Sequence, residues 1–137
     1  MPAFTTVRNA ILADYFGTAA TAMGTPLEIG LSTTQPNADG SGITEPSGGA
    51  YSRQSVANTD AEWTINTTDS YASNDNEISY AQATADWGII SHFVIYQGGN
   101  PKFFGEITDS IGAASPKNVQ NGDRFLFVAS GLKVYLV

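Results

Sequence analysis

The segment WGIISHFVIYQ, residues 87–97, carries the strongest strand signal of the chain and decides the fold. Successive side chains of a β-strand point to opposite faces of the sheet. Apolar groups occur in both alternating sets of this segment: Trp87, Ile89, Phe93 and Ile95 in one, and Ile90, His92, Val94 and Tyr96 in the other. Such a strand is expected to be covered on both faces. Since only one face of a sheet meets the core of a two-sheet domain, the second face must meet a helix, a loop or another chain.

The sequence on either side of this segment predicts further short strands. The Gly-Gly-Asn sequence at residues 98–100 predicts a hairpin that leads into a strand at 102–108. At residues 27–31, leucine and isoleucine alternate with other residues, which predicts a half-buried strand. Other strands are predicted at 51–56, 62–65, 77–81, 125–129 and 132–137, with loops at 35–49, 66–76 and 110–122. Short strands separated by turn signals predict an all-β fold, a β-sandwich or jelly-roll-like domain.

One short helix is expected near the N-terminus, at residues 5–16. Its apolar side chains recur at helical spacing: Phe4, Val7, Ile11, Leu12 and Tyr15. Thr5 or Thr6 can cap the start of the helix, and Gly17 can end it. The helix can pack on its own domain or extend to a neighbour as an arm, and the sequence leaves both arrangements open.

The length and composition indicate one domain with an unusually uncharged surface. The chain has 137 residues, which fits one globular domain. We expect residues 1–24 to form the N-terminal helix or arm and residues 25–137 to form the β-sandwich domain. Charged residues make up only 14% of the chain, against about 25% in an ordinary domain. A surface with few charges suits a protein that packs among other proteins, because an unpaired charge at a contact costs desolvation.

The charge and the cysteine content disfavour several classes of partner and site. The net charge of −7 disfavours binding to a nucleic acid backbone, which needs clustered Lys or Arg. No apolar run approaches the length of a membrane span, so no membrane partner is expected. The absence of cysteine excludes disulfides and thiolate metal sites. The N-terminus lacks the pattern of a signal peptide, so synthesis in the cytoplasm without secretion is expected.

No residue pattern predicts catalysis. His92 is the only histidine and lies in the middle of the strongest strand, where a core or interface role is commoner than that of a general base. Two pairs of carboxylates lie two residues apart: Asp60 with Glu62, and Asp75 with Glu77. They offer oxygen ligands for calcium but lack the spacing of an EF-hand, and we interpret them as parts of solvated loops. We predict no catalytic residue, no cofactor and no metal site.

Three segments stand out together: LSTTQP at 31–36 followed by GITEPSGGAYSRQ at 42–54, WGIISHFVIY at 87–96, and Asn-Gly-Asp at 121–123 ahead of two apolar strands. Their order resembles a family of small structural proteins of tailed bacteriophages, whose members are labelled tail fibre, minor tail or capsid decoration proteins. The resemblance spans residues 26–137. It implies a non-enzymatic virion protein that is made in the host cytoplasm.

Four residues of the chain are candidates for an interface with a partner: Tyr51, Arg53, His92 and Tyr96. Tyr51 can anchor the loop that precedes it, and Arg53 offers a fixed fork for a carboxylate. Fold maintenance is the alternative role for each of them. Fold maintenance is the preferred role for Trp87, which is expected to cap one end of the core.

The resemblance leaves two functions open. The preferred one is a capsid decoration, or cement, protein that binds the major capsid protein and stabilises the shell, where a homotrimer would suit local three-fold points. The other is a tail fibre or tail adaptor component that takes part in host attachment. Fibres usually have a trimerising shaft with repeats or a coiled coil, and the sequence shows neither.

A hydrolase or depolymerase of the same virion is a third class, which the lack of a nucleophile motif and of a second histidine disfavours. The expected partners are the major capsid protein or other virion proteins.

Overall fold

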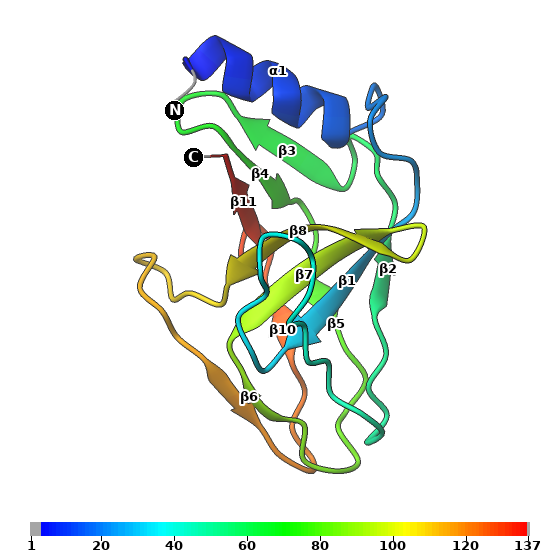
Figure 1. The fold of residues 1–137 in the computed structure, drawn as a ribbon. Coiled ribbons are helices and arrows are strands. Elements are labelled where there is room, and N and C mark those ends of the chain that lie inside the picture. Colours follow the sequence, from blue (N-terminus) through cyan, green and yellow to red (C-terminus); the bar gives the residue numbers. More distant parts are fainter. Residues whose placement is uncertain (1–3, 137) are drawn as a thin grey trace.

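The computed structural model describes residues 4–136 and shows one N-terminal helix followed by short antiparallel strands (Figure 1). The elements are α1 (Thr5–Tyr15), β1 (Leu27–Ser32), β2 (Gln54–Val56), β3 (Trp63–Asn66), β4 (Tyr71–Asn74), β5 (Ile78–Ser79), β6 (Gly88–Ile90), β7 (His92–Gln97), β8 (Asn100–Glu106), β9 (Lys117–Val119), β10 (Leu126–Phe127) and β11 (Lys133–Tyr135). The strands form a four-stranded sheet, a three-stranded sheet and two two-stranded ladders, β10-β5 and β6-β9. The predicted fold class is confirmed: the chain is mostly β, with several antiparallel sheets and an N-terminal helix.

The central sheet has the strand order β2-β1-β7-β8. β7 pairs antiparallel with β1 on one side and with β8 on the other. The predicted hairpin between β7 and β8 is present, and because Gln97 pairs with Asn100 its loop has only two residues. These residues, Gly98 and Gly99, have φ of 60° and 80°. Glycine adopts this left-handed conformation without a steric cost, and two such residues match the twist of a tight hairpin.

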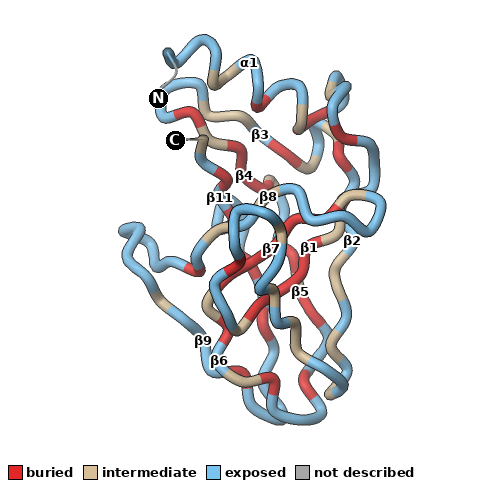
Figure 2. The backbone as a smooth tube through the Cα atoms, viewed as in Figure 1, coloured by how far each residue is buried: buried red, intermediate tan, exposed pale blue. Residues whose placement is uncertain are grey.

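One face of the central sheet forms a wall of the hydrophobic core. The buried apolar residues of β1 and β7 on this face are Leu27, Ile29, Leu31, Phe93 and Ile95. Tyr80, which follows β5, packs in the same core and donates from its hydroxyl to the Ile29 carbonyl oxygen over 2.6 Å. Figure 2 shows the buried residues gathered in the central strands, with the exposed residues in the surrounding loops and along most of α1.

The helix α1 packs against the three-stranded sheet, whose order is β11-β4-β3 (Figure 1). Leu12 is fully buried, and the ring centroid of Phe16, just after the helix, lies 5.0 Å from that of Trp63 in β3. Residues 5–16 therefore share the core of the strands. No helix in the described part of the chain has the length and apolar character that crossing a bilayer requires.

The second face of β1 and β7 is covered by the segment between β1 and β2, residues 33–53, here named the covering loop. Val94 of β7 and Gly30 of β1 both lie against residues of this loop. Of the three coverings expected for the second face, a loop is therefore the one found. The same loop buries the outer side of β1, where Ser32 accepts a hydrogen bond from it. β1 is therefore more buried than the half-buried strand predicted: Gly30 and Ser32 are buried under the loop, and of the alternating residues only Glu28 keeps partial exposure.

Residues 87–97 form two strands and not the single strand predicted. β6 pairs with β9, whereas β7 pairs with β1 and β8. The change occurs at Ser91, whose backbone N–H bonds to the end of β1 and whose carbonyl oxygen bonds to the residue after β8. The predicted alternation fails across this break: Ile90 joins the core, while Ile89 is 57% exposed.

Two strands lie where the sequence predicts loops. β4 falls within the predicted loop 66–76, and β9 falls within the predicted loop 110–122. Both strands are short and mostly polar, so neither has the apolar alternation that marks a strand, and pairing with neighbours defines them instead.

The start of the helix also differs from the prediction. Phe4 occupies the N-cap position without a side-chain hydrogen bond, so the predicted cap by Thr5 or Thr6 is wrong.

Replacement of Leu12 by Ala is expected to lower the free energy of unfolding by about 2–5 kcal/mol, because it leaves a cavity beneath α1. The matched control is Ile11→Ala in the same helix, where a side chain that is 39% exposed should cost less than about 1 kcal/mol. Urea denaturation followed by circular dichroism measures both losses. Equally small losses for the two variants would show that α1 does not belong to the core.

Candidate functional site

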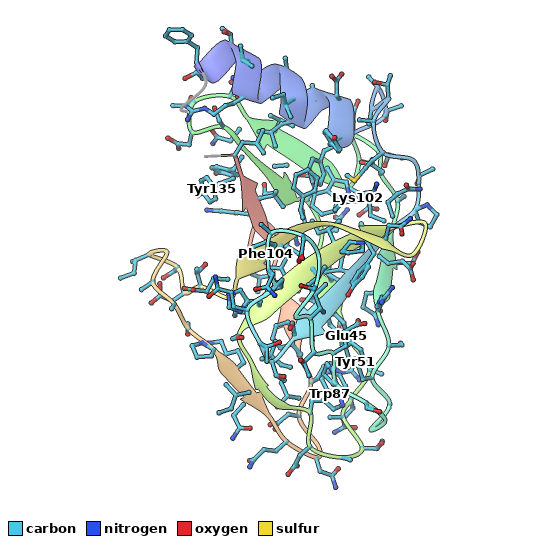
Figure 3. The ribbon with its side chains drawn as sticks, in the orientation of Figure 1. Glu45, Tyr51, Trp87, Lys102, Phe104 and Tyr135 are labelled. Carbon is cyan, nitrogen blue, oxygen red and sulfur yellow. The ribbon has the colours of Figure 1, made fainter. Side chains whose placement is uncertain are left out.

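Glu45 is the centre of a polar cluster that joins the covering loop to the central sheet. Three of the predicted interface residues meet around it: Tyr51, Arg53 and Tyr96. Glu45, Tyr51 and Arg53 belong to the covering loop, whereas Tyr96 belongs to β7. Figure 3 shows Glu45 and Tyr51 close to Trp87 in the lower half of the molecule. We name Glu45, Tyr51, Arg53 and Tyr96 the loop clamp.

Hydrogen bonds and a cation–π contact hold the loop clamp together. The Tyr51 hydroxyl donates to Glu45 Oε1 over 2.7 Å and accepts from the Leu31 N–H over 2.9 Å. The Arg53 guanidinium is bidentate: Nε donates to Glu45 Oε1 over 3.0 Å, and Nη2 donates to Oε2 over 2.9 Å. The guanidinium carbon also lies 3.5 Å from the centroid of the Tyr96 ring. Arginine combines a fork for a carboxylate with a flat face for an aromatic ring, and lysine does not.

The loop clamp keeps Glu45 ionised. Burial raises the pKa of this carboxyl, but hydrogen bonds from Arg53 and Tyr51 and the charge of Arg53 outweigh burial, so the pKa falls below its ordinary value of 4.5. The hydrogen bond to Glu45 in turn raises the pKa of Arg53. Burial, together with the bond to Glu45, raises the pKa of Tyr51. None of the three shifts brings a pKa toward neutral pH, which suits a structural role and not general acid–base catalysis.

A group of aromatic rings supports the loop clamp from the side of the core. Tyr51 stacks on Tyr80 with the ring centroids 6.3 Å apart, and it meets Trp87 edge-on at 5.3 Å. The Trp87 Nε1–H donates to the Gly49 carbonyl oxygen over 2.8 Å. Trp87 is buried, as expected for a residue that closes one end of the core. It also holds the covering loop through this hydrogen bond.

The approach of the loop clamp to β1 leaves no room for a side chain at position 30. A Cβ atom on Gly30 would lie 2.7 Å from Glu45 Oε1 and 3.0 Å from the Tyr96 ring. Glycine in a strand interior often marks a place where another group approaches the backbone closely. Here that group is the carboxylate at the centre of the cluster.

His92, the fourth predicted interface residue, is not part of the loop clamp. It begins β7, is buried, and has its Nδ1 2.8 Å from the Ser91 hydroxyl oxygen. Tyr96 is buried as well, whereas Tyr51 and Arg53 are half-buried. The structure gives all four residues contacts within their own chain, and an interface role stays a prediction for each.

The carboxylates considered as calcium ligands make separate local contacts. Asp60 Oδ1 accepts from the Thr18 N–H over 3.0 Å, and Asp75 Oδ1 accepts from the Thr64 hydroxyl. Among residues 4–136, no group of three or more histidine, aspartate or glutamate side chains is placed to hold a metal ion. The four carboxylates are therefore not gathered into one acidic cluster.

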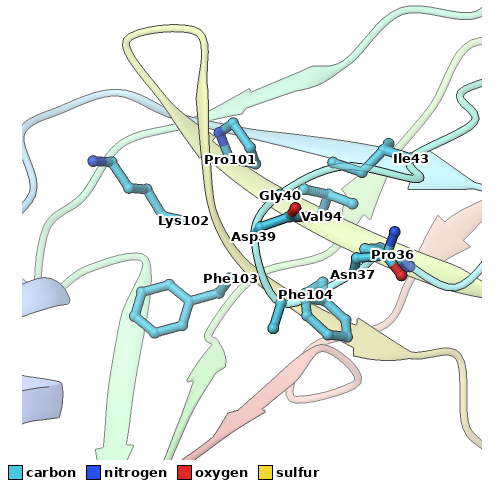
Figure 4. A pocket seen from close by; sticks show the side chains of 11 residues that line it. Pro36, Asn37, Asp39, Gly40, Ile43, Val94, Pro101, Lys102, Phe103 and Phe104 are labelled. Carbon is cyan, nitrogen blue, oxygen red and sulfur yellow. The ribbon is translucent and has the colours of Figure 1, made fainter.

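A small pocket lies between the covering loop and the β7–β8 hairpin (Figure 4). Val94 and Phe104 supply apolar lining, and Asp39 and Lys102 supply opposite charges. Hydrogen bonds from the Ser41 hydroxyl and N–H lower the pKa of Asp39. The pocket volume is about 170 Å³, below the roughly 300–1,000 Å³ of ordinary ligand sites.

An apolar stripe lies along the outer side of α1. Phe4, Val7 and Ile11 are spaced by three and four residues, so they share one face of the helix, and all three are exposed. We name these three residues the helix stripe. The sequence places them with Leu12 on a single apolar face. The structure divides that face, because Leu12 enters the core and the helix stripe stays in solvent.

Sequence reasoning missed the centre of the loop clamp. The fork of Arg53 predicts a carboxylate partner without identifying it, and the structure shows that the partner is Glu45. A signal for it exists, because Glu45 is the only carboxylate between residues 40 and 59. The helix stripe was missed for another reason: helical spacing identifies a face but does not say which part of the face meets the core.

Comparison with known proteins identifies the kind of molecule that carries this fold. A family model described as Podophage GP4 fiber I protein gp80 matches residues 2–135. No curated protein sequence matches the chain significantly. The family match spans nearly the whole chain and confirms the resemblance to phage virion proteins, the virion location and the non-enzymatic structural role. It supports the tail fibre alternative and gives no support to capsid decoration.

The ion pair of the loop clamp is expected to contribute stability that disappears in acid. A carboxyl group whose pKa is lowered by folding stabilises the protein above its unfolded pKa, and the contribution is lost as the pH falls through the folded pKa. The difference in free energy of unfolding between the wild type and Glu45→Gln should therefore be largest near neutral pH and shrink below 4.5, the ordinary pKa of this group. Urea denaturation at a series of pH values measures it.

The control for this experiment is Glu77→Gln, which changes an exposed carboxylate outside the loop clamp in the same way. Its difference from the wild type should stay small at every pH. A Glu45→Gln difference that did not change on acidification would contradict the role assigned to the ion pair.

Proposed function

We propose that the chain, which belongs to the Podophage GP4 fiber I protein gp80 family, is a structural subunit of a tail fibre or of an adaptor that joins a fibre to the tail. The family description carries this proposal, because it names a fibre protein and matches residues 2–135. Residues 4–136 form a globular body and not an elongated shaft (Figure 1). This shape favours an adaptor or a terminal domain over the shaft itself.

A structural subunit needs a surface that its neighbours bind, and the helix stripe supplies one. Exposed apolar side chains that lie together mark contact surfaces, whereas singly scattered ones do not. Burial by a partner stabilises a contact by roughly 25 cal/mol per Å² of apolar area removed from water, and Val7 and Ile11, which are already partly buried, contribute less than Phe4. The occupant proposed for the helix stripe is an adjacent protein chain of the virion.

The attachment of α1 to the core makes the helix stripe a rigid surface. Leu12 and Phe16 anchor the helix to the β-rich body, so the helix is already ordered before a partner binds. Ordering a flexible segment on binding lowers affinity, and a preformed helix avoids that loss. We therefore propose that the N-terminal arm expected at residues 1–24 contacts a neighbouring chain while its helix stays packed on the β-rich body.

The low charge of the chain supports an assembled state. Only 14% of the residues are charged, so contacts with neighbours bury few ions that need a partner. We propose that copies of the chain also associate with one another. The homotrimer expected from the sequence is one form of this association, and light scattering from the purified protein measures the oligomeric state.

The copy number of the chain in purified virions separates the proposed positions. We expect far fewer copies than of the major capsid protein, because fibres and adaptors occur only at the tail. Quantitative mass spectrometry of virions of the parent phage, with the capsid protein as internal standard, measures the ratio. A ratio close to that of the capsid protein would favour decoration of the shell and overturn the tail position.

The double substitution of Val7 and Ile11 by Ser is expected to reduce incorporation into virions severalfold while the fold is kept, because both side chains are exposed in the isolated protein. Complementation of a deletion phage, followed by immunoblotting of purified particles, measures incorporation. The matched control is Ile111→Ser, which removes an exposed isoleucine outside α1. Normal incorporation of the double variant, or an equal loss in the control, would contradict a contact at the helix stripe.

A further inference from the structure

The outward face of the sheet β11-β4-β3 carries a surface that the proposed function does not use. The residues on this face are polar or aromatic and lie in two rows: Thr64, Ser73 and Lys133 in one, and Asn66, Tyr71 and Tyr135 in the other. The residues that alternate with them, Ile65, Ala72 and Val134, lie in the core or pack against it. Side chains of a strand alternate between its faces, so these six residues form the outward face. On it Thr64, Lys133 and Tyr135 are exposed, Asn66 and Tyr71 are half-buried, and Ser73 is buried.

A groove of about 440 Å³ lies on this face. The groove is shallow and open to solvent, so a ligand would lie across the face of the sheet and not inside a cavity. Most of its lining side chains carry hydroxyl or amide groups, among them Thr64, Asn66, Thr68, Tyr71, Ser73 and Ser130. Asp75 is the only charged side chain among the described residues that line it. The groove therefore offers many neutral donors and acceptors at one place.

Hydrogen bonds within the groove hold its side chains in position. The Asn66 amide donates to the Tyr71 hydroxyl over 3.1 Å. The Asn66 side-chain oxygen Oδ1 accepts from the backbone N–H groups of Thr68 and Asp69, which fixes the turn between β3 and β4. A site whose polar groups are already ordered loses less entropy when a ligand binds.

Aromatic rings lie beside these polar groups. The ring centroids of Tyr71 and Tyr135 are 4.9 Å apart, and the rings are inclined at 51°. Lys133 Nζ lies 5.0 Å from the Tyr71 ring centroid. Tyr135 is 52% exposed and lies toward the left edge of the view in Figure 3. A ligand that uses both features must present hydrogen-bonding groups to the hydroxyl and amide side chains and an apolar surface to the exposed ring.

We propose that this groove binds a saccharide. A sugar ring presents hydroxyl groups around its edge and C–H groups on its faces, so it needs hydrogen-bonding side chains beside an aromatic ring. The net charge of −7 and the carboxylate of Asp75 favour neutral or N-acetylated sugars over acidic ones. This inference deepens the proposed function and rests on it for its setting, because a fibre or adaptor is the part of a virion that meets polysaccharide at a cell surface.

The groove has the chemistry for binding and not for cleavage. Hydrolysis of a glycosidic bond usually needs two carboxyl groups on either side of the bond. Asp75 is the only carboxylate among the described lining residues, and it already accepts a hydrogen bond from Thr64. A bound saccharide would therefore be released unchanged, in keeping with the non-enzymatic family.

The test is binding of the full-length purified protein to an array of immobilised neutral, N-acetylated and acidic oligosaccharides. We expect binding to neutral or N-acetylated members and not to acidic ones. The best member is then titrated into ¹⁵N-labelled protein, and the amide resonances that shift should lie in β3, β4 and β11. Thr64→Val and Tyr135→Ala should each weaken this binding roughly tenfold, the loss expected for a hydrogen bond or an aromatic contact.

Two controls keep the result interpretable. Lys102→Ala alters the smaller pocket beneath the covering loop and should leave saccharide binding unchanged. If Thr64→Val fails to fold, Tyr135→Ala decides the question, because its side chain is largely in solvent. Absence of binding to every array member, or binding that survives both Thr64→Val in the groove and Tyr135→Ala beside it, would overturn the inference. A low virion copy number together with no saccharide binding would overturn this inference alone, whereas binding together with a capsid-like copy number would overturn only the tail position.

Discussion

The bidentate pair between Glu45 and Arg53 allows β1 and β7 to be buried on both sides. The outer face of these strands needs a cover, and residues 33–53 provide it without a strand of their own. A segment without a backbone ladder keeps only a few backbone bonds, such as the one from the Thr33 N–H to the Thr44 carbonyl oxygen, so side chains supply the rest of its attachment. The loop clamp holds one part of it, and the Ser32 hydroxyl holds another by accepting from the N–H groups of Thr34 and Thr44 over 3.2 and 3.1 Å. Release of these bonds would uncover the outer face of β7, where His92, Val94 and Tyr96 are buried.

The need to hold the covering loop on the central sheet occupies the polar groups of that region, so the surfaces that are free for contacts lie elsewhere in the molecule. In the central sheet and its covering loop, most of the notable polar groups bond to one another, so little of their hydrogen-bonding capacity is left for a partner. The layer formed by α1 and the sheet β11-β4-β3 differs. It presents the helix stripe on one side and the saccharide groove on the outward face of the sheet. A neighbouring virion chain and a cell-surface ligand can therefore be bound by one layer without disturbing the loop clamp.

Periodicity in the sequence predicts those parts of this fold in which side-chain direction is regular. It locates β1 by a period of two and the helix by a period of 3.6, whereas β7 is marked by apolar residues in both alternating sets and the hairpin by its two glycines. It fails at Ser91, where a change of pairing partner reverses the facing of Ile89 and Ile90. Periodicity also fails for β4, a polar strand that is defined only by its pairing with neighbours. Because the sequence predicts β4 as a loop, the saccharide groove on its sheet could not be predicted either. In the candidate site, three of the four predicted residues come together. His92 does not join them. It shares a face of β7 with Tyr96, but the four residues between their positions correspond to roughly 13 Å along a strand, which is too far for contact with the loop clamp.

The neutral polar residues have a second role that composition alone does not reveal. Their abundance is consistent with a surface that packs among other proteins, yet several lie inside the molecule. Asn74 is fully buried, donates to the carbonyl oxygens of Asn76 and Val128, and accepts from the Leu132 N–H. Asn58 joins the end of α1 to the body by accepting from the Gly17 N–H and donating to the Tyr15 carbonyl oxygen. Strands of two to four residues leave much loop backbone without a ladder partner, and buried amides satisfy it. The same side chains that suit an assembled surface therefore also replace secondary structure in the interior, which explains how so irregular a chain keeps rigid surfaces for its neighbours.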